Sequence, residues 1–167
     1  MTYTDELVNY PLTALLKIAD SKECVGLLLN KNPNSITDED IDFACDNKMF
    51  DYSFVNSTTQ EVTAYIFVEA DVYRVKNRQI KNLALYVTIA CHKNFMRLDP
   101  TIFSGVAGNR RENLARHIDS VLNFSDLFGI GELQLHSIKT GNLGNGFTLK
   151  ELEYRIPDFN RGSEKIG

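Results

Sequence analysis

The side chains that could do chemistry in this chain are first of all its three cysteines, Cys24, Cys45 and Cys91. Their spacing is long and irregular, without the C-x-x-C pair that begins a zinc site or a redox motif, so we interpret them as reduced, small apolar residues. His92 follows Cys91 directly, but neighbouring residues of a strand point to opposite faces of a sheet. The two therefore cannot act as nucleophile and base unless the strand contains a bulge.

The remaining candidate motifs also favour structural roles. His117 and His136 have no metal-ligand or catalytic partner at a motif spacing, and the chain contains no G-x-S-x-G, H-E-x-x-H or Walker sequence. The glycines of segment 141–146 precede a strand-like run, whereas a phosphate loop needs a helix N-terminus at that place. We interpret this segment as a flexible hairpin tip that could become ordered only against a partner. The sequence therefore indicates no catalytic residue, no metal site and no cofactor, and we expect a protein that is not an enzyme.

An acidic run near residue 40 has two interpretations. Asp38, Asp40 and Asp42 match the first ligands of a calcium loop, but the glycine of the sharp turn and the closing glutamate of such a loop are both missing. Thr37 with Asp40 three positions later instead approximates a capping box, which is typical of a helix start. We favour the helix.

Arg110 and Arg111 lie at the predicted start of a helix, where their positive charge opposes the helix dipole. If this unfavourable interaction with the dipole is compensated, we expect an acidic side chain as the partner of the arginines. A solvated surface is the plain interpretation, and an intersubunit salt bridge or a contact with DNA phosphate is the functional one.

Composition and charge indicate an ordinary folded domain. The chain has 167 residues, of which 43% are hydrophobic and 24% charged, with a net charge of −4. Such a balance argues against disorder and against a dedicated nucleic-acid binder, and no apolar run reaches the length of a membrane span. We expect residues 1–160 to form one domain and residues 161–167 a tail.

The charges are nevertheless segregated along the chain. Segment 38–71 contains nine acidic residues and one basic residue, Lys48, whereas segment 74–97 contains six basic residues and no acidic one. An acidic surface that meets a basic one can set the register between subunits.

Hydrophobic periodicity predicts the elements that position these groups. Residues 4–19 read as a helix with Thr4 as its N-cap, in which Pro11 causes a kink or else marks a later start capped by Asn9. Its predicted apolar face consists of Leu7, Leu12, Leu15, Leu16 and Ile18. A second helix begins after Asn109, which is a good N-cap, and Glu112 completes a capping box there.

The middle of the chain gives the clearest signal for strands. Segments 59–75 and 79–95 are rich in Val, Ile, Thr, Tyr and Phe, and the polar link 76–78 joins them into a predicted long β-hairpin. Both faces carry apolar residues, so we expect the second face to be covered by a helix or by another subunit. Two further strands, about 132–139 and 147–156, complete an α+β fold, with a mainly antiparallel sheet packed against two or more helices.

Four segments are informative together: TIACHKNF at the end of the strand pair, the helix start GNRRENLARHID, the segment FGIGELQLHS and the closing strand KELEYRIPDF. With these segments and its elements in this order, the chain resembles the tail terminator and neck (head-to-tail) connector proteins of tailed bacteriophages. The resemblance implies a structural virion protein that assembles in the host cytoplasm. It also implies a homo-oligomeric ring, typically a hexamer, that contacts the tail tube and head-connector proteins and leaves a channel for DNA.

Ring formation is compatible with the charge pattern, because a heterologous ring brings two different surfaces of one subunit together. We therefore expect acidic residues of segment 38–71 to face basic residues of segment 74–97, or Arg110 and Arg111, of a neighbour. The candidate interface residues are Arg74, Arg78, Glu69, Asp71, Arg110 and Arg111. Two other classes stay open: a small-molecule-binding domain or enzyme with an unrecognised active site, and a nucleic-acid-associated protein.

Overall fold

The computed structural model describes residues 5–55, 60–77, 80–128 and 131–156. Its α-helices are α1 (Asp5–Ala19), α2 (Lys22–Leu29), α3 (Asp38–Asn47) and α4 (Arg110–Leu122). Its strands are β1 (Met49–Phe50), β2 (Ala64–Asn77), β3 (Ile80–His92), β4 (Gln134–Gly144) and β5 (Phe147–Arg155). The two 3-10 helices are η1 (Pro33–Ser35) and η2 (Lys93–Phe95). This arrangement confirms the predicted α+β class with its long hairpin.

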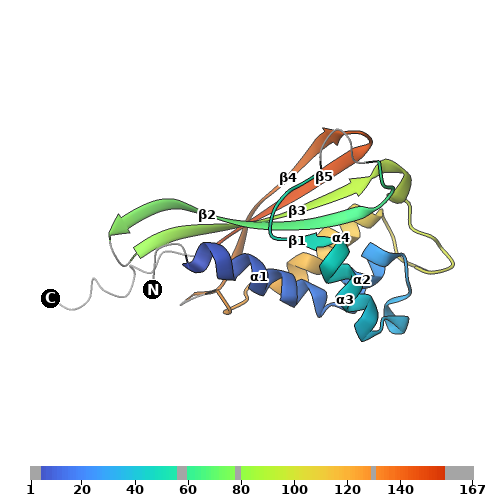
Figure 1. Cartoon of the computed structure of the whole chain (residues 1–167), viewed down its shortest axis with the longest axis horizontal. Helices are drawn as coiled ribbons and strands as arrows, with labels where there is room; N and C mark the ends of the chain where they lie inside the picture. Colours follow the sequence, from blue (N-terminus) through green and yellow to red (C-terminus); the bar gives the residue numbers. More distant parts are fainter. Residues whose placement is uncertain (1–4, 56–59, 78–79, 129–130, 157–167) are drawn as a thin grey trace.

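The strands form one sheet in the order β1-β2-β3-β5-β4. All neighbouring pairs are antiparallel except β1 with β2, which is parallel and only two residues long. Figure 1 shows the helices gathered on one side of this twisted sheet, with α1 running along the β2–β3 hairpin. We call the side that carries the helices the inner face and the other side the outer face.

The main core lies between the inner face and the helices. From β2 it takes Ala64, Ile66 and Val68, which are completely buried, as the alternation of the sequence predicted. Cys91 at the end of β3 belongs to this core, whereas the adjacent His92 packs its ring against Phe147. The two side chains thus lie on opposite faces, which confirms that expectation.

The outer face carries a second, aromatic cluster near the β1 end of the sheet. Tyr65 and Phe67 of β2 are buried there together with Phe147, and Phe50 and Phe54 pack on them. The sequence predicted that a helix or another subunit covers this face. In this part of the sheet the chain's own segment 50–55 covers it.

Local capping signals decide where the helices begin. Thr37 and Asp40 form the predicted reciprocal capping box, which places Asp38, Asp40 and Asp42 on a helix and removes the geometry of a calcium loop. Asn109 caps α4 through a bond from the Glu112 N–H, at 2.9 Å. The carboxylate of Glu112 turns to Arg111 and Lys150, so its role in a capping box was predicted wrongly.

The first helix continues through Pro11, so the alternative start with Asn9 as cap is wrong. Thr4, the other proposed cap, lies outside the described residues. Leu15 and Ile18 of its predicted apolar face are buried, but Leu12 and Leu16 are 45% and 65% exposed. The helix therefore presents apolar residues to the outside as well as to the core.

The glycine segment is a tight hairpin tip between β4 and β5. Gly144, Asn145 and Gly146 have positive φ values of 85°, 50° and 81°. The Lys93 N–H donates to the Gly146 carbonyl at 2.7 Å, so the tip is held by its own chain and needs no partner to be ordered.

Substitution of Gly146 by alanine is expected to lower the free energy of unfolding by about 1 to 3 kcal/mol. Besides the strained φ, the new Cβ would lie 2.8 Å from Nε2 of the packed His92 ring. Gly141→Ala is the matched control, because its Cβ would meet only Leu149 at 3.9 Å. Urea denaturation of both variants measures the difference, and equal unfolding midpoints would contradict this account of the tip.

Candidate assembly surface

Four carboxylates gather on and beside the outer face of the sheet. Glu69 and Asp71 alternate along β2 and are both exposed, and Glu151 projects from β5. Asp51, from the segment after β1, lines the same depression as these three. We call Asp51, Glu69, Asp71 and Glu151 the acidic surface. Glu69 and Asp71 are thus accessible to a partner, while their contact with a neighbour stays a prediction.

Tyr86 lies in the middle of the acidic surface, in register with Glu69 on one side and Glu153 on the other. Partial burial raises the pKa of its hydroxyl, and the negative charges of Glu153 and Asp71 raise it further. The hydroxyl group of Tyr86 therefore stays protonated at physiological pH and can donate a hydrogen bond among the carboxylates.

Glu153 marks the border of the acidic surface and is buried. Burial raises the pKa of its carboxyl, but hydrogen bonds from Arg155 at 2.7 Å and from Ser137 at 3.0 Å together outweigh that effect and lower it. This acid is satisfied within the chain, so the charge offered to the outside comes from the other four.

The predicted basic counterpart is less compact than its sequence suggests. Arg74 belongs to the far part of β2, where its Cα pairs with Asn82 next to a bulge, and Arg78 lies outside the described residues. Lys93 and Arg97 are exposed at the opposite end of the hairpin. The basic run of segment 74–97 is therefore divided between the two ends of the sheet.

Arg110 is an interior residue, with 1% of its surface exposed. Its Nε donates to the Phe95 carbonyl at 2.7 Å, its Nη2 donates to Asn30 Oδ1 at 2.7 Å, and its Nη1 donates to the Leu27 carbonyl. The guanidinium also lies 3.8 Å from the centre of the Phe95 ring. Although burial lowers its pKa to about 10, the group remains charged at neutral pH.

These contacts correct the sequence interpretation of Arg110. The compensation that its position at a helix start requires comes from oxygen atoms and an aromatic ring of its own chain, and no acidic partner supplies it. Its guanidinium faces α2 and η2, so a neighbouring subunit cannot reach it in this fold.

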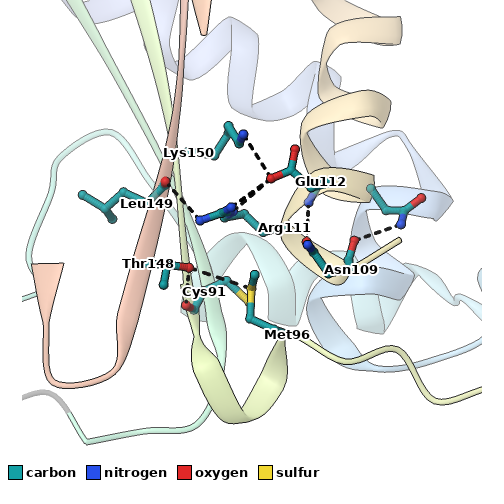
Figure 2. Close-up of polar contacts among 9 residues, drawn as sticks. Cys91, Met96, Asn109, Arg111, Glu112, Thr148, Leu149 and Lys150 are labelled. Atoms are coloured by element: carbon teal, nitrogen blue, oxygen red, sulfur yellow. Dashed lines mark hydrogen bonds and ion pairs between the residues drawn. The ribbon is translucent and has the colours of Figure 1, made fainter. Parts of the chain in front are cut away.

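Arg111 is mostly buried between α4 and β5. As Figure 2 shows, Glu112 accepts from Arg111 at 2.9 Å and from Lys150 at 3.0 Å, while Arg111 also donates to the Leu149 carbonyl at 3.4 Å. The same view shows Thr148 of β5 in contact with Cys91 and Met96. Arg111 thus fastens α4 to the sheet, and only a remaining 12% of its side chain is exposed to a partner.

The most exposed apolar feature of the described surface lies on α1, and the sequence did not predict its exposure. Val8, Leu12 and Leu16 of α1 follow one another at four-residue intervals and are 61%, 45% and 65% exposed. Such spacing places them in one row along the helix, which we call the apolar row. The four-residue repeat was visible in the sequence, but a single apolar face for this helix was assumed.

Two of the three thiols are buried core groups, and among the described residues no group of His, Cys, Asp and Glu side chains is arranged to hold a metal ion. Burial raises the pKa of Cys24 to about 12 and that of Cys91 to about 11, so both thiols stay protonated and unreactive at neutral pH. Within the same part of the chain no helix is long and apolar enough to cross a membrane.

Comparison with known proteins gives a family and a distant structural likeness. A family model described as YomW matches residues 9–156. No curated protein matches the chain. Among solved structures, a chain from the "Virion of native gene transfer agent (GTA) particle" is similar over 68% of this chain and 80% of its own length, with a TM-score of 0.43 and 11% sequence identity.

Proposed function

The chain belongs to the YomW family, and we propose that it is a structural protein of a tailed-phage particle, acting as a ring-forming tail terminator or neck connector subunit. In this role it works by binding other protein subunits. It is located in the virion after assembly in the host cytoplasm.

The observation that carries the proposal is the exposed apolar row beside the acidic surface. Pro11 directly precedes Leu12 in α1 and lines the same depression as Glu69 and Asp71. It therefore connects the apolar row to the acidic surface. Exposed apolar side chains in a continuous row, bordered by charge, are typical of a protein–protein interface. An assembly subunit needs such a surface, whereas an isolated monomer gains nothing from it.

The resemblance of the strand pair and of the α4 start to tail terminators supplies the rest of the proposal. It supports a hexameric ring at the head-proximal end of the tail tube, where the subunits stop tube growth and join the head. The tube protein and the head connector are then its partners, and DNA passes through the ring.

Binding to tail tubes tests this function directly. Purified, gold-labelled protein is mixed with tail tubes of the phage that encodes it and viewed by electron microscopy. The proposal predicts label at one end of each tube, because a terminator recognises the last tube ring only. Label along the whole tube, or none on it, would contradict the proposal.

A further inference from the structure

The sheet ends on one side in an edge strand that is open for most of its length. β1 pairs with β2 only at Ile66 and Phe67, and within the described residues no other strand pairs with β2 on that side. The Ile66 N–H donates to the Lys48 carbonyl at 2.8 Å, so the N–H and C=O groups of Val68 and Ala70, two and four residues later, point to the same side. Among the described residues, this edge therefore presents backbone donors and acceptors that no strand of the chain pairs.

The opposite edge of the sheet is β4. It pairs with β5 on one side, and in the described part of the chain no strand lies on its other side. Its side chains are mostly exposed, and a bulge between Leu135 and Ser137 separates its start from the longer outer part. The chain therefore has two open edges of similar length.

We propose that β4 of one copy pairs with the open part of β2 of the next copy, so that the sheets of neighbouring subunits join. This inference rests on the proposed ring. Because β2–β3, β3–β5 and β5–β4 are all antiparallel, β4 runs opposite to β2. A neighbour rotated about an axis parallel to the strands keeps this direction, so the two edges meet as an antiparallel pair. The helices of both copies then lie on the same side of the joined sheet.

The inner sides of the two edges match in apolar character. Ile138 of β4 is in register with the buried Leu152, so its side chain is on the inner face, yet it is 52% exposed. On the other edge the apolar row of α1 flanks β2 on the same face, and α4 contacts α1 on the side of Lys17. Pairing of the edges would bring Ile138 of one copy to Val8 and Leu12 of the next.

The outer sides match in charge. Lys139 is exposed on the outer face, in register with Glu151, and makes no ion pair within the described part of the chain. The sequence contains no acidic residue from Leu133 to Lys150 and no basic residue from Glu61 to Val72. The β2 edge with Glu69 and Asp71 would therefore face an edge that carries Lys139 and no acidic residue. This favours pairing of β2 with β4 over pairing of two β2 edges, in which like charges would meet.

A charge swap tests the pairing. Lys139→Glu and Asp71→Lys are each expected to raise the protein concentration needed for assembly at least about tenfold, because like charges then meet at the edge. The two changes combined in one chain are expected to recover most of the loss. Lys22→Glu is the matched control, since Lys22 is exposed at the start of α2, which contacts α3 and α4. Assembly is followed by light scattering over a dilution series.

The outcomes separate the two proposals. Rings that form equally well with Lys139→Glu and Asp71→Lys would overturn the edge pairing and leave the ring function standing. Open filaments that are sensitive to the swap would support the edge pairing and contradict the closed ring. A wild-type protein that stays monomeric, alone and with tail tubes, would overturn both.

Discussion

Replacement of Arg110 by alanine is expected to lower the free energy of unfolding by about 3 to 5 kcal/mol. The change leaves the Leu27 and Phe95 carbonyls and the Asn30 side-chain oxygen without their donor, and it removes a large buried side chain. Chemical denaturation monitored by circular dichroism measures the loss.

Arg116→Ala is the matched control for this prediction, because Arg116 lies on the same helix and is exposed. Its substitution is expected to change the unfolding free energy by less than about 0.5 kcal/mol. If Arg110→Ala unfolded at the same denaturant concentration as Arg116→Ala, the guanidinium would not have the structural role described above.

This burial also changes how the arginine pair can be used to study assembly. Reversal of both arginines to glutamate would unfold the subunit as well as remove any contact with a neighbour, because a carboxylate at residue 110 would face carbonyl oxygens in the interior. Charge reversals that test assembly belong at exposed residues such as Asp71 and Lys139.

Substitution of both Leu12 and Leu16 by glutamine is expected to weaken subunit association at least about a hundredfold, because burial of each leucine contributes about 1.5 to 3 kcal/mol. Glutamine is nearly as good a helix former as leucine, and both side chains are largely exposed in the single chain. The thermal unfolding midpoint of the dissociated subunit should therefore change little. Light scattering and thermal denaturation of the same sample give the two values.

Phe43→Gln controls for the general loss of exposed apolar surface. Phe43 is 51% exposed on α3 and does not belong to the apolar row of α1. The Phe43→Gln substitution should leave association unchanged. Equal loss of association in both variants would mean that the apolar row has no special place in the interface. A lowered unfolding midpoint of the leucine variant alone would mean that the row stabilises the fold itself.

The parts of the fold that follow local rules could be predicted from the sequence. The β2–β3 hairpin shows in its two runs rich in β-branched and aromatic residues joined by a polar link. The caps Thr37 and Asn109 accept from N–H groups three residues away. Both signals depend on neighbours in the chain, so one sequence is enough to detect them.

Features that depend on distant contacts escaped prediction. Arg110 bonds to residues about 80 positions earlier in the chain, and nothing near it in sequence announces that it is buried. The same holds for the sheet order, in which β5 inserts between β3 and β4, and for the parallel pair of β1 with β2. The acidic surface was predicted in part: Glu69, Asp71 and Asp51 belong to the acidic segment 38–71, whereas Glu151 comes from β5, which the fold brings beside them.

The central claim is that the exposed edges and the apolar row serve self-assembly into a ring. Light scattering on the purified full chain, with electron microscopy of the same sample, tests it most directly. The account predicts closed rings whose mass is a fixed multiple of the subunit mass and which fall apart on dilution. A particle of subunit mass at every concentration, with and without tail tubes, would contradict it.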